Sequence, residues 1–213
     1  MADSKIRHQV EQQPMRPSPT NPNPVDFGSN VIIFDPSDST IQIQTQQALG
    51  TNTQFGLTRT AFFFKPGVYN NLTVQIGYYT TVHGLGALPD DVTISGGGVQ
   101  SLGVRPNGLA LNNFWRGVEN LSILPLTPLA LPEYPPGNLW AVSQATFMRR
   151  VHVKGVLYLY DANYDGIGGN YSSGGFIADS VVDTSIWPGT QQQFLTRNTS
   201  VTNFNGGVWS KSP

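Results

Sequence analysis

The feature that most constrains the fold is a short pattern that recurs through the second half of the chain. Each copy opens with phenylalanine followed by a second bulky apolar residue, and the copies begin at Phe114, Phe147, Phe176 and Phe194. They return at intervals of roughly 20 to 35 residues, which is typical of solenoids and propellers. Because the copies look like strands and show no helical periodicity, they favour a solenoid built from strands.

We therefore predict an all-β fold, a right-handed parallel β-helix in which successive copies stack on one face. Short strands of about four to six residues, separated by turns, continue this pattern toward the N-terminus. An antiparallel β-sandwich with the same number of strands is the alternative. Residues 27–213 are predicted to form one β-helix domain, and the polar, proline-rich residues 1–26 a disordered N-terminal segment.

Composition narrows the classes of function. The chain has no cysteine, which excludes disulfides and thiolate chemistry. Its net charge of −1 gives no strong field toward nucleic acid or a membrane, and neither is expected as a partner. The sequence has no run near the roughly 20 apolar residues of a membrane span, and its start lacks the apolar stretch of a signal peptide. We expect a cytoplasmic protein.

A turn motif in the first half supports the β-helix. The segment 63–69 reads Phe-Phe-Lys-Pro-Gly-Val-Tyr. It resembles the entry strand of pectate-lyase-type right-handed parallel β-helices, which implies that the first coil begins here. A helix is predicted over 40–49, ended by Gly50. This helix would cap the open N-terminal end of the solenoid.

Stacking the copies without gaps predicts columns of charge. Equivalent residues on adjacent coils lie about 4.8 Å apart. The alignment gives three outward groups: Arg150, Asp179 and Arg197; Lys154 and Asp183; Glu119 and His152. These groups could form a catalytic groove. The favoured interpretation is a ladder of charges that holds the coils in register, each exposed pair contributing about 0–1 kcal/mol.

Aromatic residues and two long loops suggest a second kind of site. The loops are expected over 124–136 and 158–175. The aromatic residues predicted to face outward are Trp115, Trp140, Tyr158, Tyr160, Tyr164 and Trp187. Flat aromatic faces suit sugar binding, and glycoside hydrolysis would need two carboxyl groups, for which Asp161, Asp165 and Asp179 are candidates. Alternatively, most of these rings pack beneath the loops.

Five strings carry a resemblance to a known family. They are Trp140-Ala-Val-Ser-Gln-Ala, Met148-Arg-Arg-Val-His-Val-Lys, Ser172-Ser-Gly-Gly-Phe-Ile-Ala-Asp-Ser, Gln191-Gln-Gln-Phe-Leu and Asn205-Gly-Gly-Val-Trp. They resemble the fungal and bacterial β-helix proteins labelled "coagulation factor 5/8 type domain" proteins, whose short members, including plant-derived ones, are labelled adenylyl cyclase. The resemblance runs from about Phe27 to Trp209. Longer members continue past the last string, so we expect a truncated C-terminal end prone to self-association.

The resemblance implies an adenylyl cyclase, a lyase that converts ATP to cyclic AMP and pyrophosphate. Asp179 and Asp183 would then hold Mg²⁺ or Mn²⁺. The catalytic residues would be Asp179, Asp183, Arg150 and Arg197, and the cofactor-binding residues Lys154, Arg149 and His152. The sequence lacks the short plant-type cyclase pattern and the helices of the class III cyclase fold.

The alternative function is a carbohydrate-binding or glycoside-hydrolase-like β-helix. Its partner would be a polysaccharide in place of ATP, and it would need no cofactor. The outward aromatic residues and loop carboxylates carry this hypothesis.

Overall fold

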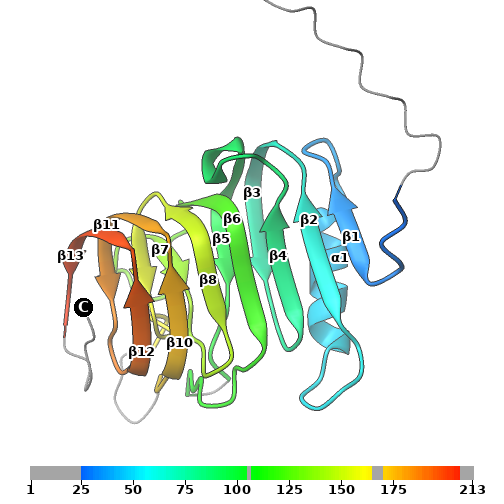
Figure 1. The fold of residues 1–213 in the computed structure, drawn as a ribbon. Coiled ribbons are helices and arrows are strands. Elements are labelled where there is room, and N and C mark those ends of the chain that lie inside the picture. The colour runs from blue at the N-terminus through cyan, green and yellow to red at the C-terminus, as the bar shows by residue number, and fades with distance from the viewer. Residues whose placement is uncertain (1–24, 105–106, 165–169, 207–213) are drawn as a thin grey trace, which may run out of the picture.

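The chain winds into a parallel β-helix (Figure 1). The structure is a computed structural model that describes residues 25–104, 107–164 and 170–206. Every pairing between named strands is parallel. This confirms the β-helix prediction and excludes the antiparallel sandwich.

The strands divide among three faces of the helix. Face A consists of β1 (Val31–Phe34), β2 (Thr60–Phe64), β4 (Thr80–Gly84), the starts of β6 (Arg116–Pro125) and β8 (Phe147–Val153), the end of β10 (Ser173–Ala178) and β12 (Gln192–Arg197). Face B consists of the starts of β3 (Gly67–Gln75), β5 (Val92–Gln100), β11 (Val181–Trp187) and β13 (Ser200–Phe204), with the second halves of β6 and β8. Face C consists of the ends of β3, β5, β11 and β13, with β7 (Gly137–Leu139) and β9 (Val156–Tyr158).

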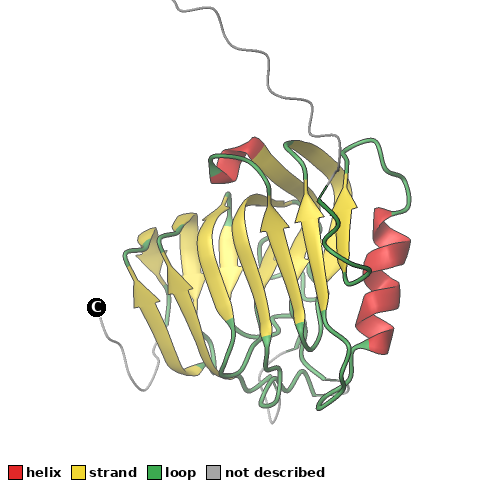
Figure 2. Cartoon of the chain, turned by 45° about the vertical axis from the view of Figure 1, so that its right-hand side comes forward, coloured by secondary structure: helices red, strands yellow, loops and turns green. Residues whose placement is uncertain are grey.

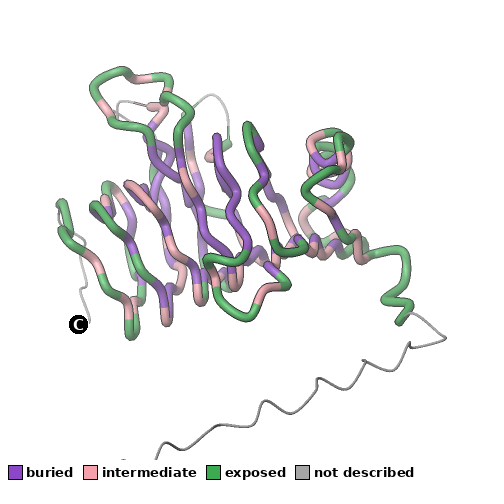
Figure 3. The backbone as a smooth tube through the Cα atoms, turned by 90° about the horizontal axis from the view of Figure 1, so that it is seen from above, coloured by how far each residue is buried: buried purple, intermediate pink, exposed green. Residues whose placement is uncertain are grey.

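The core is a stack of apolar side chains inside the coils. On face A, one inward column contains Ile32, Phe62, Val82, Val118, Met148 and Ile177, each opposite the next. All but the first are fully buried. Burying each such side chain contributes about 1.5–3 kcal/mol. Figure 3, seen from above the view of Figure 1, shows buried positions interrupted by intermediate and exposed ones along the strands, as expected when strand neighbours point to opposite sides.

A helix covers the N-terminal end of the stack. Helix α1 (Ile41–Thr51) lies beside β1 and packs on β3 (Figure 2). It buries Ile41, Thr45 and Ala48, and so it caps the first coil as predicted. A short 3₁₀ turn, η1 (Pro89–Asp91), precedes β5.

The register of the repeat is partly as predicted. Met148 lies opposite Ile177, which confirms the alignment of the second and third copies. The first copy was aligned wrongly, because Phe147 lies opposite Gly117 and not Phe114. A side chain at Gly117 would collide with the Phe147 ring, 2.3 Å from the position of a Cβ atom. The absence of a side chain therefore lets this ring lie across the neighbouring strand.

The last copy is also shifted. Leu195, and not Phe194, lies opposite Phe176. Arg197 consequently lies opposite Ala178, one position away from the column predicted for it. Phe194 instead points inward and is buried.

Some predictions fall outside the described residues. These are the disordered segment over 1–24 and the C-terminal residues 207–213. Within the described ranges, no helix is long and apolar enough to span a membrane.

Candidate functional site

Most charged residues singled out from the sequence lie at, or next to, the corner between faces A and B. Four residues at this corner share the left-handed backbone conformation: Asn120, Arg150, Asp179 and Asn198, with φ of 56°, 52°, 52° and 47°. Asparagine and aspartate tolerate this conformation better than most residues do. The repeated backbone angle turns each coil sharply at the same place, and it stacks these four positions.

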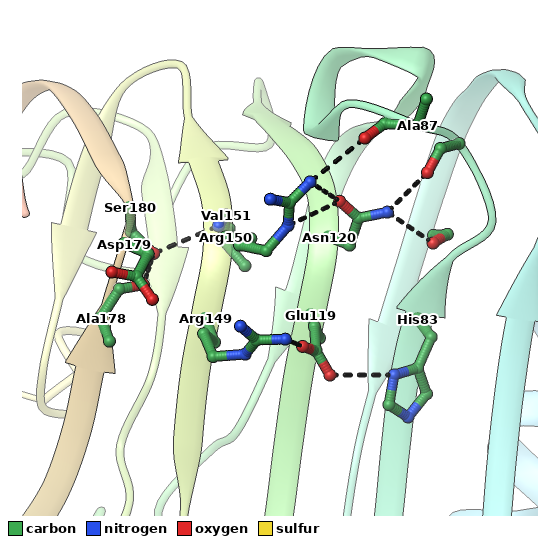
Figure 4. A network of polar contacts seen from close by, with 12 residues as sticks. His83, Ala87, Glu119, Asn120, Arg149, Arg150, Val151, Ala178, Asp179 and Ser180 are labelled. Atoms are coloured by element: carbon green, nitrogen blue, oxygen red, sulfur yellow. Dashed lines mark hydrogen bonds and ion pairs between the residues drawn. The ribbon is translucent and has the colours of Figure 1, made fainter.

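The corner side chains bond to one another along the helix axis (Figure 4). Asn120 Nδ2 donates to the carbonyls of Gly84 and Gly86, at 2.9 and 2.8 Å. The Arg150 guanidinium donates to Asn120 Oδ1 at 3.1 and 3.2 Å and to the Ala87 carbonyl at 3.1 Å. Arg150 therefore ties its own coil to the preceding coil and to the loop above it.

The next two coils are joined in the same way. Asn198 Nδ2 donates to Asp179 Oδ1 at 2.9 Å. Arg197 Nη2 lies 3.8 Å from Asp179 Oδ2. Arg197 thus meets Asp179 across the corner, although the two do not occupy the shared column predicted from the sequence.

A second ladder of ionisable side chains crosses face A. Glu119 lies opposite Arg149 and forms an ion pair with it. Its other oxygen is 3.6 Å from His83 Nδ1 on the preceding coil. The predicted pairing of Glu119 with His152 is therefore wrong, because the first copy is out of register. Partial burial lowers the pKa of His83, and the nearby Glu119 opposes that shift.

A third cluster lies on face B, around His152. Its Nδ1 is 2.9 Å from Asp90 Oδ1 on η1, and its Nε2 is 2.9 Å from Asp183 Oδ1. Lys154 Nζ also reaches Asp90 Oδ1, at 3.0 Å. The Ser122 hydroxyl donates to Asp90, and this bond is the main cause that lowers the pKa of Asp90 to about 2.

These contacts limit what the predicted catalytic residues can do. Asp179 and Asp183 belong to different clusters. In the described part of the chain, no group of three or more His, Asp or Glu side chains is placed to hold a metal ion. The carboxyl groups with a resolved pKa shift there, Asp35, Asp38 and Asp90, are all shifted downward. They would stay ionised at neutral pH, whereas a general acid must carry a proton. The catalytic roles of Asp179, Asp183, Arg150 and Arg197, and metal binding by the two aspartates, remain predictions.

Three of the aromatic residues predicted to face outward are buried. Trp140 and Tyr158 are fully buried, and Tyr160 is 6% exposed. Tyr134, a residue of the long loop, packs on Tyr158 and Trp187 with ring centroids 5.9 Å apart in each case. Tyr158 in turn packs on Tyr160 at 5.9 Å and on Trp187 at 5.7 Å. For Tyr158, Tyr160 and Trp187 the alternative interpretation, rings packed beneath a loop, is correct, whereas Trp140 belongs to the core inside the coils.

Asp161, one of the loop carboxylates, is held by hydrogen bonds. Asp161 is 2% exposed and accepts hydrogen bonds from the backbone of Gly103 and from Asn163. It fastens the loop to the body of the helix. Asp165 lies outside the described residues, and Tyr164 is half-buried.

An aromatic row that sequence reasoning recognised only in part lies at the start of the face A strands. Tyr79 and Trp115 directly precede β4 and β6, and each has a φ of 54°. Their rings are stacked, with centroids 4.9 Å apart and planes inclined by 5°. The guanidinium of Arg59, which precedes β2, lies 3.5 Å from the Tyr79 ring centroid, on the preceding coil. Phe55 meets Trp115 edge-on at 5.7 Å.

This row could have been sought from the sequence. Arg59, Tyr79 and Trp115 each stand immediately before a strand of face A. The predicted copies of the repeat all begin with phenylalanine. The strands that begin at Thr60 and Thr80 are therefore not among them. Asp90 was missed for another reason, since a 3₁₀ turn carries it onto face B.

Comparison with known proteins shows what this chain resembles. No family model matches it. An exo-β-1,3-glucanase of Streptomyces sp. (strain SirexAA-E / ActE) is 44% identical over 187 residues, which are 87% of this chain and 29% of the relative. The solved structure of sacteLam55A from Streptomyces sp. SirexAA-E superposes with a TM-score of 0.75 at 42% identity, over 87% of this chain and 32% of that one. A variant of sacteLam55A in complex with glucose gives a TM-score of 0.74 at 41% identity. The chain thus spans about a third of the length of the proteins it matches.

These matches correct the functional prediction. The resemblance to "coagulation factor 5/8 type domain" proteins and adenylyl cyclases is wrong, because the chain is similar instead to a β-1,3-glucanase. The predicted cyclase activity, lyase class and ATP substrate depended on this resemblance and are wrong as well. The physical reason is visible in the structure, where residues assigned to phosphate are engaged by other side chains of the same protein. Arg149 pairs with Glu119, and Lys154 and His152 with Asp90.

Proposed function

We propose that this chain is a carbohydrate-recognising β-helix of the glycoside-hydrolase type that acts on β-1,3-linked glucans. The observation that carries the proposal is the 44% identity to an exo-β-1,3-glucanase across 87% of the chain. The agreement of the three-dimensional path supports it, with a TM-score of 0.75. The glucose complex of a similar protein supports a sugar as the ligand.

The surface chemistry of the chain agrees with a neutral sugar polymer. Tyr79 and Trp115 form a partly exposed aromatic pair, and aromatic side chains offer apolar surface for contact with sugar rings. Most charged side chains of faces A and B are engaged by partners of the same protein. A neutral ligand would not need to displace these partners. Glycoside hydrolysis proceeds with carboxyl groups and water, so we expect no metal requirement.

The experiment compares two glucose hexamers that differ in linkage. Isothermal titration measures binding of laminarihexaose (β-1,3-linked) and of cellohexaose (β-1,4-linked) to the purified chain. A parallel assay measures glucose released from laminarihexaose, with and without EDTA. We expect binding that prefers the β-1,3-linked hexamer and is indifferent to EDTA. Equal affinity for both hexamers, or none for either, would contradict the proposal.

A further inference from the structure

A row of small side chains runs across the outer surface of face A at its N-terminal end. Val31, Ala61, Thr81 and Gly117 lie opposite one another on β1, β2, β4 and β6. The residues on either side of them along each strand point inward. This row therefore forms a low floor between larger neighbours.

The aromatic row described above is the first wall of this groove. Arg59, Tyr79 and Trp115 stand two residues before the floor position on their strands. Arg59 and Trp115 hold Tyr79 from both faces, so the wall is rigid without a ligand. Together with Asn30, Val31, Thr60, Ala61 and Thr81, these three residues line a cavity of about 360 Å³.

The second wall lies on the other side of the floor. Ile33, Phe63 and His83 lie opposite one another, two residues after the floor positions. The Phe63 and His83 rings meet edge to face at 5.3 Å, and Phe27 packs on Phe63 at 5.7 Å. Figure 4 shows His83 on the outer surface of β4, beside Glu119 of the next coil.

The groove has a closed end. The Phe147 ring occupies the space above Gly117, so the floor is covered where β6 meets β8. At the other end the floor begins at Val31 on β1, the first strand of face A. A ligand in the groove would therefore lie along the helix axis, with one end against Phe147. Each coil it crosses would add about 4.8 Å of contact.

We propose that this groove is the binding subsite for a β-1,3-glucan chain, laid along the helix axis across β1, β2 and β4. The inference rests on the proposed function and adds a location to it. Sugar rings carry apolar faces and hydroxyl edges. The exposed part of the aromatic wall and the apolar floor at Val31 and Ala61 offer contact for the former, and Asn30, Arg59 and Thr81 offer polar groups for the latter. The small floor residues let the rings reach the wall.

The test uses one variant that removes the wall and one that fills the floor. Trp115→Ala should weaken laminarihexaose binding by roughly 3- to 10-fold, the usual range for losing an aromatic contact. Trp115→Phe should restore most of that affinity. Ala61→Trp leaves both walls in place but occupies the floor, and it should abolish binding. Leu88→Ala is the control, because Leu88 is 63% exposed and lies away from the groove. Thermal unfolding followed by circular dichroism checks that each variant folds.

The outcomes separate this inference from the proposed function. If the unaltered chain does not bind laminarihexaose, both fail. If it binds, but Trp115→Ala and Ala61→Trp bind equally well, the groove is wrong and the proposed function stands. If Trp115→Ala fails to fold, the decision rests on Ala61→Trp, whose new side chain projects from the outer surface. Loss of binding in folded Ala61→Trp, with Leu88→Ala unaffected, supports the groove.

Discussion

At the scale of single residues, Arg116 is a buried cation held by neutral acceptors. It is 5% exposed, and its guanidinium donates to the carbonyls of Ile76 and Phe114 and to the Ser101 hydroxyl, at 3.0, 3.3 and 3.2 Å. Burial lowers its pKa to about 10, so it remains charged at neutral pH. Because Arg116 directly follows Trp115, these bonds also position the aromatic row.

Removal of this side chain should therefore be costly. Arg116→Ala leaves three acceptors without this donor, two of them buried, and each buried unsatisfied group costs about 1–3 kcal/mol. We expect the free energy of unfolding to fall by at least about 2 kcal/mol in urea titrations, with laminarihexaose binding weakened as Trp115 loosens. Arg149→Ala, which removes an exposed arginine of the same face, is the matched control and should cost about 0–1 kcal/mol. Equal losses for the two variants would contradict this account of Arg116.

The aspartates predicted to be catalytic make a second residue-scale case. Asp179 meets Asn198 and Arg197, and Asp183 meets His152, all across adjacent coils. We expect Asp179→Asn and Asp183→Asn each to lower the free energy of unfolding by about 0–1 kcal/mol, as exposed ion pairs do. Glucose release from laminarihexaose should stay within about two-fold of the unaltered chain. A large loss of release without loss of stability would instead assign them a catalytic role.

At the scale of elements, the turn after β2 shows why the Pro-Gly-x-Tyr motif begins a coil. Gly67 has a φ of 145°, and a Cβ atom there would lie 2.4 Å from the Pro36 ring, so glycine is required. The buried Tyr69 hydroxyl donates to the carbonyls of Phe34 and Lys65, at 3.1 and 2.9 Å. These bonds tie the new coil to the end of β1. Burial is the main cause that raises the pKa of Tyr69 to about 12.

A single-atom change tests this role of the hydroxyl. Tyr69→Phe keeps the ring in the core but leaves both carbonyls without the donor. We expect the free energy of unfolding to fall by about 1–3 kcal/mol in chemical denaturation. Tyr171→Phe serves as the comparison because Tyr171 is 44% exposed, and its stability should not change measurably. Should Tyr69→Phe prove as stable as the unaltered chain, water must satisfy these carbonyls instead.

At the scale of the whole molecule, ion pairs that join coils make stability depend on pH. The pKa of Asp90 is lowered from 3.8 to about 2 in the folded chain, chiefly by the Ser122 hydroxyl. A carboxyl with a lowered folded pKa stabilises the fold above its unfolded pKa, and this contribution is lost as pH falls through the folded value. The loss should therefore occur between about pH 4 and pH 2.

Thermal unfolding across that range checks the prediction. The melting temperature should fall as pH drops from 4 to 2, and Asp90→Asn should flatten part of this slope. Asp26→Asn is the control, because the Asp26 carboxylate accepts a hydrogen bond from the Gly28 amide within its own turn. If the two variants follow the same curve as the unaltered chain, the link from η1 to face B contributes nothing to acid sensitivity.

Part of the fold could be predicted from local patterns in the sequence. The period of the phenylalanine copies and the Pro-Gly turn depend on neighbouring residues, so they indicated the β-helix and its helical cap. The alignment failed at Gly117 and at Leu195, because the coils differ in length and a phenylalanine can lie on either side of a strand. Each of these two misalignments affected a predicted charge pair. Glu119, for example, pairs with Arg149 and not with His152.

The sequence by itself determined the architecture, since alternation of small and bulky residues between turns is compatible with few folds other than stacked strands. It also placed Arg150 and Asp179 on one column, because each stands three residues after the phenylalanine of its copy. Only the tertiary structure decided which aromatic residues reach the surface. Trp140 and Tyr158 became core residues, while Tyr79 and Trp115 formed a partly exposed wall. Burial and contact between coils depend on long-range register, and register is set by how all coils pack together.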